Sequence, residues 1–258
     1  MTFLVTAIAL AIFALPMLRD VPQRGQIQAV GFDGLGVLIG FGITCLVAAV
    51  TSPMMGFGFV LAVIVHETGG ALACRIAGQD VARLRLVPLP FIAPPRSDRA
   101  FTTALEESFV ALYGPALAIV PMVLAFGLFH AFAATAPAFA DLMRATAIML
   151  GAFNFIMLLP FLPFAGGRVM RAVSEAFWPN LGVLVTAFMT AAFLAAALRD
   201  GSIAMFVLSA AGAQSLLHKK RSEQVVLSPN EALLVMATYG FALTAHFTGG
   251  WWLIGSLM

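Results

Sequence analysis

The chain has 258 residues, of which 61% are hydrophobic and only 10% are charged, and its formal net charge is +2. A soluble globular domain carries about 25% charged residues, so this composition excludes an ordinary soluble protein. We therefore predict an all-α integral membrane protein that forms a single polytopic domain over residues 1-258 and has no nucleic-acid partner.

Apolar runs along the chain are long enough to cross about 30 Å of hydrocarbon as helices. They predict about eight spans: Thr2–Leu18, Leu35–Thr51, Pro53–Cys74, Phe109–Phe129, Leu142–Pro160, Leu181–Leu198, Ser202–Leu217 and Glu231–Phe247. With the N-terminus outside, twelve lysines and arginines fall on the cytoplasmic side, and only Arg144 and Arg199 fall outside. Because short cytoplasmic loops collect basic residues, we expect this orientation. The excess of arginine over lysine and the abundance of alanine are typical of proteins from GC-rich bacterial genomes. We therefore expect the chain in a bacterial inner membrane.

The connection from Gly78 to Ala100 is unusual for a membrane protein. Polar and apolar residues alternate over 82–87, a two-residue period that favours a strand or hairpin. Four prolines follow within 88–95 and exclude a continuing helix. We expect a short β-like or re-entrant cytoplasmic segment near 82-95. Short amphipathic helices at the membrane surface are predicted at Arg99–Ser108 and Gly166–Trp178.

The third expected span carries the sequence His66-Glu67-Thr68-Gly69-Gly70. A charged residue near the centre of a span costs about 2.5 to 3.5 kcal/mol, and residues kept at that cost usually have a function. In the pattern His-Glu-x-x-His, two histidines four residues apart bind zinc from one helix face, and the glutamate is the general base. Here Gly70 stands in place of the second histidine.

A second polar segment ends the fifth expected span. It begins at Asn154, contains Pro160 and Pro163, and finishes in Ala165-Gly166-Gly167. Both this span and the third run inward in the expected orientation. We therefore expect the two segments to reach similar depth on the cytoplasmic side.

Together with Gly114-Pro115, these motifs resemble the site-2 protease family of intramembrane zinc metalloproteases. That family carries His-Glu-x-x-His on one span and Asn-x-x-Pro-x-x-Pro-Leu-Asp-Gly-Gly, with variable spacing, on a later one. The resemblance covers a protease-like core of about residues 53-173. It does not cover the flanking spans, 2-51 and 181-247.

The resemblance implies that His66 is equivalent to the first zinc ligand and Glu67 to the general base. Gly70 and Ala165 then replace the second histidine and the ligand aspartate. A catalytic zinc needs three protein ligands and a water, so we predict no cofactor. If the scaffold is a relic, the double change Gly70→His with Ala165→Asp should restore zinc binding.

The remaining histidines are not expected to rebuild the site. His130 and His218 fall on opposite sides of the membrane, and His246 is expected near the outer end of the last span. Residues that could keep a role in the cleft or in partner binding are His66, Glu67, Asn154, Pro160 and Pro163.

The leading hypothesis is a catalytically inactive protein of site-2 protease type that acts as a binding or assembly subunit for other membrane proteins. Its expected partners are a membrane protein or transmembrane helix, and lipid. One alternative is an active zinc intramembrane protease with unconventional ligands. Another is a small transporter or proton-handling protein that uses Glu67 as an intramembrane carboxylate, although the chain shows no paired repeats of the kind many carriers have.

Overall fold

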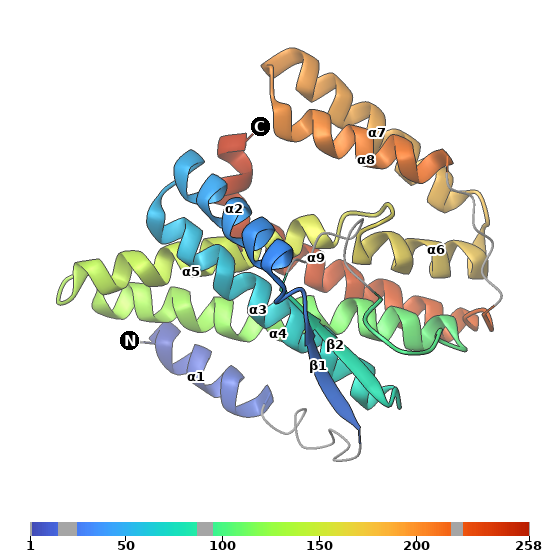
Figure 1. Cartoon of the computed structure of the whole chain (residues 1–258), viewed down its shortest axis with the longest axis horizontal. Coiled ribbons are helices and arrows are strands. Elements are labelled where there is room, and N and C mark those ends of the chain that lie inside the picture. The colour runs from blue at the N-terminus through green and yellow to red at the C-terminus, as the bar shows by residue number, and fades with distance from the viewer. Residues whose placement is uncertain (1, 15–24, 87–94, 218–223, 258) are drawn as a thin grey trace.

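The structure, a computed structural model, describes residues 2–14, 25–86, 95–217 and 224–257 (Figure 1). It is 77% helical and includes a two-stranded sheet. The helices are α1 (Thr2–Ala14), α2 (Gly34–Val50), α3 (Pro53–Ile76), α4 (Ala104–Phe132), α5 (Pro137–Met157), α6 (Ala165–Phe177), α7 (Leu181–Asp200), α8 (Ile203–Leu217) and α9 (Pro229–Leu257). The strands are β1 (Gln26–Val30) and β2 (Val81–Arg85).

A helix lies at the place of each expected span. Five of them, α3, α4, α5, α7 and α9, are long and apolar enough to cross a membrane. The helices α1, α2 and α8 are shorter, at 13, 17 and 15 residues. The prediction of a helical membrane protein is confirmed, whereas eight crossings remain a prediction.

Local sequence determines where the main helices begin. The Ser52 side chain caps α3 ahead of Pro53, the first helical residue, whose missing N–H would have no partner there in any case. The Thr103 hydroxyl accepts a hydrogen bond from the Glu106 N–H at 3.1 Å and starts α4. The prediction of a separate surface helix at 99–108 is therefore wrong. The helix begins at Ala104, and residues 104–108 are the first part of α4. The other predicted surface helix is present as α6.

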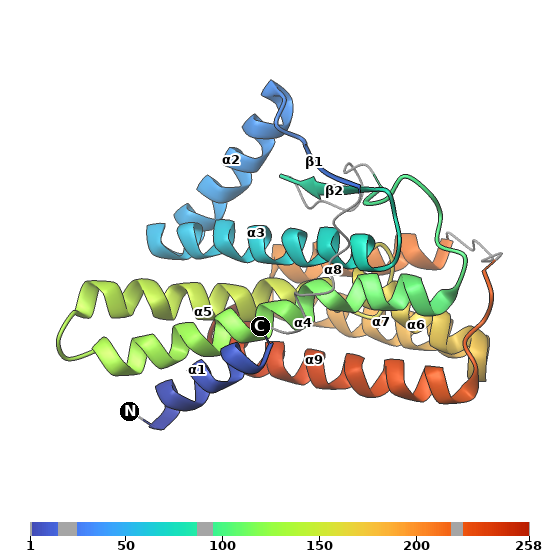
Figure 2. The ribbon, with the colours of Figure 1, turned by 90° about the horizontal axis from the view of Figure 1, so that it is seen from below.

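The core of the bundle has layers that Figure 2 shows from the side. The sheet lies on one side of α3, and α4 and α5 pack on the other, with α9 beyond them. The pair α7 and α8 lies to one side in Figure 1 and contacts α6 and the loop that follows α5. Helices α3, α4 and α5 therefore surround the motif residues.

Two glycines let α3 and α4 approach closely beside the motif. A Cβ at Gly69 would lie 2.8 Å from the Gly114 Cα, and a Cβ at Gly114 would lie 2.7 Å from the His66 carbonyl oxygen. Real Cβ atoms essentially never make contacts this short. The Gly114-Pro115 motif thus has a steric reason in this chain, independent of any resemblance.

The expected strand is confirmed over Val81–Arg85, and it pairs in parallel with β1. The register places Gln26 opposite Val81 and Val30 opposite Arg85. The chain turns from α3 towards β2 at Gly78, where a φ of 80° favours glycine. The rest of the expected re-entrant segment, 87–94, lies outside the described residues.

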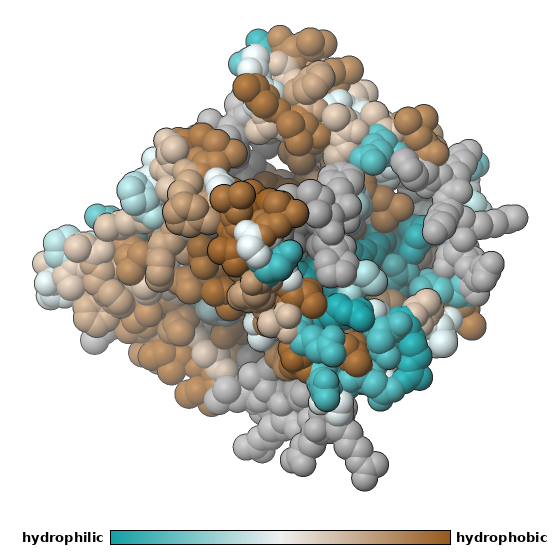
Figure 3. Space-filling view, viewed as in Figure 1, coloured by the Kyte–Doolittle hydropathy of each residue, from teal (hydrophilic) through white to brown (hydrophobic). Residues whose placement is uncertain are grey.

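The surface separates into apolar and polar regions (Figure 3). Hydrophilic residues gather over β1 and β2, and apolar residues cover much of the rest of this face. Helix α2 buries none of its residues, and apolar side chains such as Phe41 and Leu38 are 67% and 66% exposed. Such helices suit contact with lipid, which is the solvent for the apolar faces of a membrane protein.

Candidate functional site around Glu67

Glu67 is fully buried and is held by two arginines. The Arg85 guanidinium binds it with two hydrogen bonds, from Nε to Oε2 and from Nη2 to Oε1, both at 2.9 Å. The Arg96 Nη2 donates to Oε1 at 2.5 Å. The Arg85 backbone N–H also points at Oε2, at 3.4 Å. Charge-assisted, bidentate bonds of this kind are among the strongest that proteins make, so both carboxylate oxygens are occupied.

His66 is buried beside Glu67 and is fixed by α5. Its Nδ1 lies 2.7 Å from the Asn154 Oδ1, and the Asn154 Nδ2 donates to the Leu150 carbonyl oxygen at 2.9 Å. Because the amide oxygen is then the acceptor, Nδ1 carries the proton of a neutral imidazole, and Nε2 keeps the lone pair. The Phe153 ring packs edge-on against the imidazole with centroids 5.4 Å apart. His66 of α3 and Asn154 of α5, both expected in the cleft from the sequence, are therefore in contact.

The space above Gly70 is filled by an arginine. A Cβ added at Gly70 would collide with the Arg96 guanidinium. Side chains at positions 66 and 70 share one helix face. The space that a histidine at position 70 would need is therefore occupied by a cation.

Three of the motif residues, His66, Pro163 and Ala165, line one small pocket. It has a volume of about 20 Å³, room for about one water molecule. Its lining is His66, Arg85, Arg96, Val110, Ala111, Met157, Pro163, Phe164, Ala165 and Arg168. Ala165, where the resemblance expects an aspartate, thus lines the same pocket as His66. This agrees with the expectation that the two polar segments reach similar depth.

Of the expected cleft residues, His66 and Pro163 line this pocket, whereas Glu67 and Asn154 do not. Pro160 also lies outside it. It lines a separate cavity of about 490 Å³, between the loop after α5, α6 and the α7–α8 pair. Contacts on both sides hold the loop in place. The Tyr239 hydroxyl donates to the Leu158 carbonyl oxygen at 2.7 Å, and the Leu162 N–H donates to the Ser215 hydroxyl at 3.1 Å. Pro160 and Pro163 therefore face different cavities.

The Gly166-Gly167 pair is needed where α6 begins. A Cβ at Gly166 would collide with the backbone of Leu158 and Leu159, and one at Gly167 with the backbone of Phe161 and Leu162. These glycines let the first turn of α6 pack directly on the loop. That packing positions Ala165 and Arg168 at the pocket.

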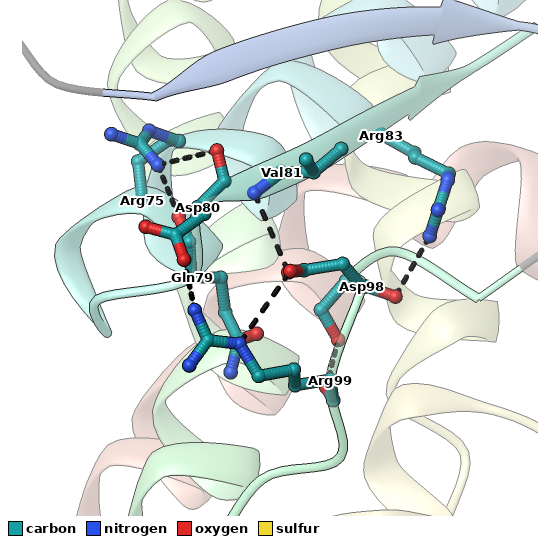
Figure 4. Close-up of polar contacts among 8 residues, drawn as sticks. Arg75, Gln79, Asp80, Val81, Arg83, Asp98 and Arg99 are labelled. Atoms are coloured by element: carbon teal, nitrogen blue, oxygen red, sulfur yellow. Dashed lines mark hydrogen bonds and ion pairs between the residues drawn. The ribbon is translucent and has the colours of Figure 1, made fainter.

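A polar network fixes the segment that carries Arg96 (Figure 4). The backbone N–H of Arg83 on β2 donates to the Arg96 carbonyl oxygen at 2.7 Å, and the Arg83 Nη1 donates to the Ser97 carbonyl oxygen at 2.8 Å. Asp98 accepts from the Val81 N–H at 3.4 Å, and Arg99 pairs with Asp80 (Figure 4). The segment is thereby tied to β2 on both sides of Arg96.

Burial weakens the protonation of these arginines without removing their charge. It lowers the pKa of Arg96 to about 10, against the opposing attraction of Glu67. Burial also lowers the pKa of Arg168, against the attraction of Glu107. A pKa of about 10 leaves Arg96 a cation at neutral pH, so positive charges surround the pocket.

These residues do not fit a catalytic zinc ion. His66 is the one family-equivalent ligand in the pocket, and within the described ranges there is no group of three or more histidines, cysteines or carboxylates. Three guanidinium groups, those of Arg85, Arg96 and Arg168, border the same space. They would repel a divalent cation.

His246 lies deeper in the bundle than we expected. It is fully buried, and its Nε2 is 2.8 Å from the Pro115 carbonyl oxygen, one residue from Gly114. It is not among the residues that line the pocket. The expected position near an outer end is therefore wrong, because α9 continues past His246 to Leu257.

Comparisons with protein-family models, with curated proteins and with solved structures find no match for this chain. The site must therefore be interpreted from its own geometry.

Arg85, Arg96 and Arg168 are the site residues that sequence reasoning missed. It used them only as markers of the cytoplasmic side. One signal was available, because an ionisable residue inside a membrane protein almost always pairs with an opposite charge. A buried Glu67 therefore required a cation, but only the fold reveals which arginine reaches it.

Proposed function

We propose that this chain is a catalytically inactive protein of site-2 protease type that binds or helps to assemble other membrane proteins. We further propose that it lies in a bacterial inner membrane with its N-terminus outside. The observation that carries the proposal is the position of Arg96. Its guanidinium stands over Gly70 and shares Glu67 with Arg85.

This arrangement is unsuited to hydrolysis. A general base needs a free lone pair within hydrogen-bond reach of the water it activates. Both oxygens of Glu67 accept hydrogen bonds from guanidinium groups, and the pocket beside it has room for about one water. Freeing Glu67 would leave Arg85 and Arg96 as buried charges without their partner, which is costly.

Several features of a protease-like scaffold nevertheless remain. Gly69 and Gly114 keep α3 against α4, and Asn154 still fixes His66. A cleft whose walls remain and whose reactive groups are paired with arginine is better suited to holding a ligand than to chemistry.

The cavity beside Pro160 supports a role in binding a partner. It opens between α6 and the α7–α8 pair, and both apolar and polar side chains line it, among them Val183, Arg171 and Asn180. Its volume of about 490 Å³ is enough for several side chains of a partner segment.

The test combines co-purification in mild detergent with metal analysis of the same sample. We expect a membrane protein to co-purify and zinc to be far below one ion per chain. The change Val183→Trp, in the cavity, should reduce the amount of partner that co-purifies. The change Val207→Trp, at an exposed site on α8 outside that cavity, should leave that amount unchanged.

Two results would overturn the proposal in favour of the alternatives. Stoichiometric zinc together with cleavage of a transmembrane substrate that Glu67→Gln abolishes would establish an active protease. Uptake by proteoliposomes that Glu67→Gln abolishes would establish a transporter. The pairing of Glu67 with two arginines weighs against both, because the guanidinium groups occupy the carboxylate oxygens that would have to accept a proton.

A further inference from the structure

A second, larger cavity adjoins the small pocket beside His66 and is strongly basic. It has a volume of about 480 Å³ and shares Arg85, Arg96 and Arg168 with the small pocket. Arg99 and Arg171 bring its guanidinium groups to five, against the carboxylates of Asp98 and Glu107. The described part of the cavity therefore carries an excess of positive charge.

The carboxylates do not neutralise the innermost arginines. Glu107 binds Arg171 at 2.8 Å, and Asp98 pairs with Arg99 at 3.6 Å. Glu67 serves Arg85 and Arg96 together, so one negative charge faces two positive ones.

Two donors remain without a partner in the described residues. The Arg96 Nε is buried and makes no hydrogen bond, although 9% of the side chain is exposed. Arg168, which lines both cavities, makes no hydrogen bond or ion pair with any described residue. Keeping a guanidinium charge away from bulk water costs free energy unless an anion accepts its hydrogen bonds.

The start of α6 adds to this positive field. No side chain caps the helix, and Ala165, its first residue, lines the small pocket. The first N–H groups of a helix and the positive end of its dipole attract anions. Here this feature coincides with an unpartnered arginine, so two independent features point to an anion.

The cavity lies at one end of two long helices. Its lining includes the segment before α4 and Gln224, a few residues before α9 begins, so it lies at one end of these two long helices. Membrane-spanning helices end at the level of the lipid headgroups. Basic pockets between helices at this level bind anionic headgroups.

From this geometry we infer that Arg168 and Arg96 bind an anionic phosphate group, either of a phospholipid headgroup or of a small soluble molecule. The phosphate oxygens would accept hydrogen bonds from the Arg168 guanidinium, and the charge of Arg96, which lines the same cavity, would add to the attraction. Arginine suits this role, because its planar fork of donors matches phosphate geometry. The inference does not depend on whether the chain has lost a protease activity.

The experiment compares the full chain with Arg168→Gln and with the control Arg199→Gln. Arg199 is exposed and pairs with Asp200 at the far end of α7, so its loss removes the same charge elsewhere. Each protein is delipidated in neutral detergent. Phosphatidylglycerol, phosphatidylcholine or inorganic phosphate is then added, and lipid retention and the midpoint of thermal unfolding are measured.

We expect the wild type and Arg199→Gln to retain phosphatidylglycerol over phosphatidylcholine. Arg168→Gln should bind phosphatidylglycerol at least about tenfold more weakly, the loss expected for one charged hydrogen bond. If inorganic phosphate instead stabilises the wild type but not Arg168→Gln, and neither lipid is preferred, the ligand is a soluble phosphate.

The unfolding midpoints distinguish a binding residue from a structural one. Without any anion, Arg168→Gln should unfold at the same temperature as the wild type or higher, because it removes an uncompensated charge. The wild type should become the more stable protein when the anion is added. The inference is overturned if neither anion distinguishes the two proteins, or if Arg168→Gln is less stable under every condition.

Discussion

At the scale of single residues, Glu67 shows how the groups around a carboxylate decide what it can do. In the protease pattern this carboxylate acts on a metal-bound water. Here it is the counter-ion of Arg85 and Arg96, and the guanidinium of Arg96 takes the space above Gly70. The positive charge next to the glutamate is therefore supplied by the chain itself.

The first prediction follows from this pairing. Glu67→Gln should lower the free energy of unfolding by about 3 to 5 kcal/mol, because it leaves two buried guanidinium groups without their counter-ion. Chemical denaturation in a fixed detergent measures the change. Glu106→Gln, at the exposed start of α4, is the control and should cost no more than about 1 kcal/mol. Equal effects of the two changes would contradict the assigned role of Glu67.

The second prediction concerns metal binding. The sequence alone predicts that the double change Gly70→His with Ala165→Asp restores zinc binding. The structure predicts that it does not, because the Arg96 guanidinium occupies the space of the new imidazole. Adding Arg96→Ala removes that obstacle and one positive charge, so the triple variant should bind zinc more tightly than the double one. Metal analysis after dialysis checks this. Zinc binding by the double variant alone would show that Arg96 can move aside.

At the scale of secondary-structure elements, close helix packing explains the glycines of the motifs. Gly69 and Gly114 bring α3 and α4 together at His66, and Gly166 and Gly167 bring α6 onto the preceding loop. The sequence signals for helix starts, such as Thr103 with Glu106, lie within one turn and could be read directly. The pairing of β1 with β2 joins residues far apart in the sequence, so no local pattern could reveal it.

The third prediction tests this packing. Gly114→Ala should destabilise the protein by about 1 to 3 kcal/mol, the usual cost of overpacking, because the new methyl group meets the His66 carbonyl oxygen. Gly42→Ala is the matched control on α2, where nothing lies within 4 Å of an added Cβ. It should be neutral or stabilising by up to about 1 kcal/mol. Thermal unfolding of both variants in one detergent gives the comparison.

At the scale of the whole molecule, the distribution of charge predicts an orientation in the membrane. The basic residues of the Glu67 site and of the adjoining cavity lie at one end of α3 and α4, near the sheet and α6. This end is the cytoplasmic one in the orientation that the lysines and arginines predict. The same residues thus indicate the topology and form the site.

The fourth prediction tests this orientation. The test uses a background with Cys45→Ser and Cys74→Ala and a membrane-impermeant thiol reagent. Applied to spheroplasts with an intact inner membrane, the reagent should label Ala134→Cys and not Asn180→Cys. Both positions are exposed, one between α4 and α5 and the other before α7. Both should be labelled once the membrane is opened. The reverse pattern in intact cells would invert the proposed topology.

Sequence patterns alone were enough to predict a helical membrane protein, a helix at the place of each expected span, the strand after α3 and the two segments that meet at the site. These features depend on hydrophobicity and on patterns within a few residues, which local physics governs. The fold was needed to reveal that Arg85 and Arg96 bind Glu67, that Arg96 fills the space at Gly70, and that Arg168 makes no hydrogen bond or ion pair with a described residue. Long arginine side chains can reach many positions, so which carboxylate each one meets depends on how distant segments pack.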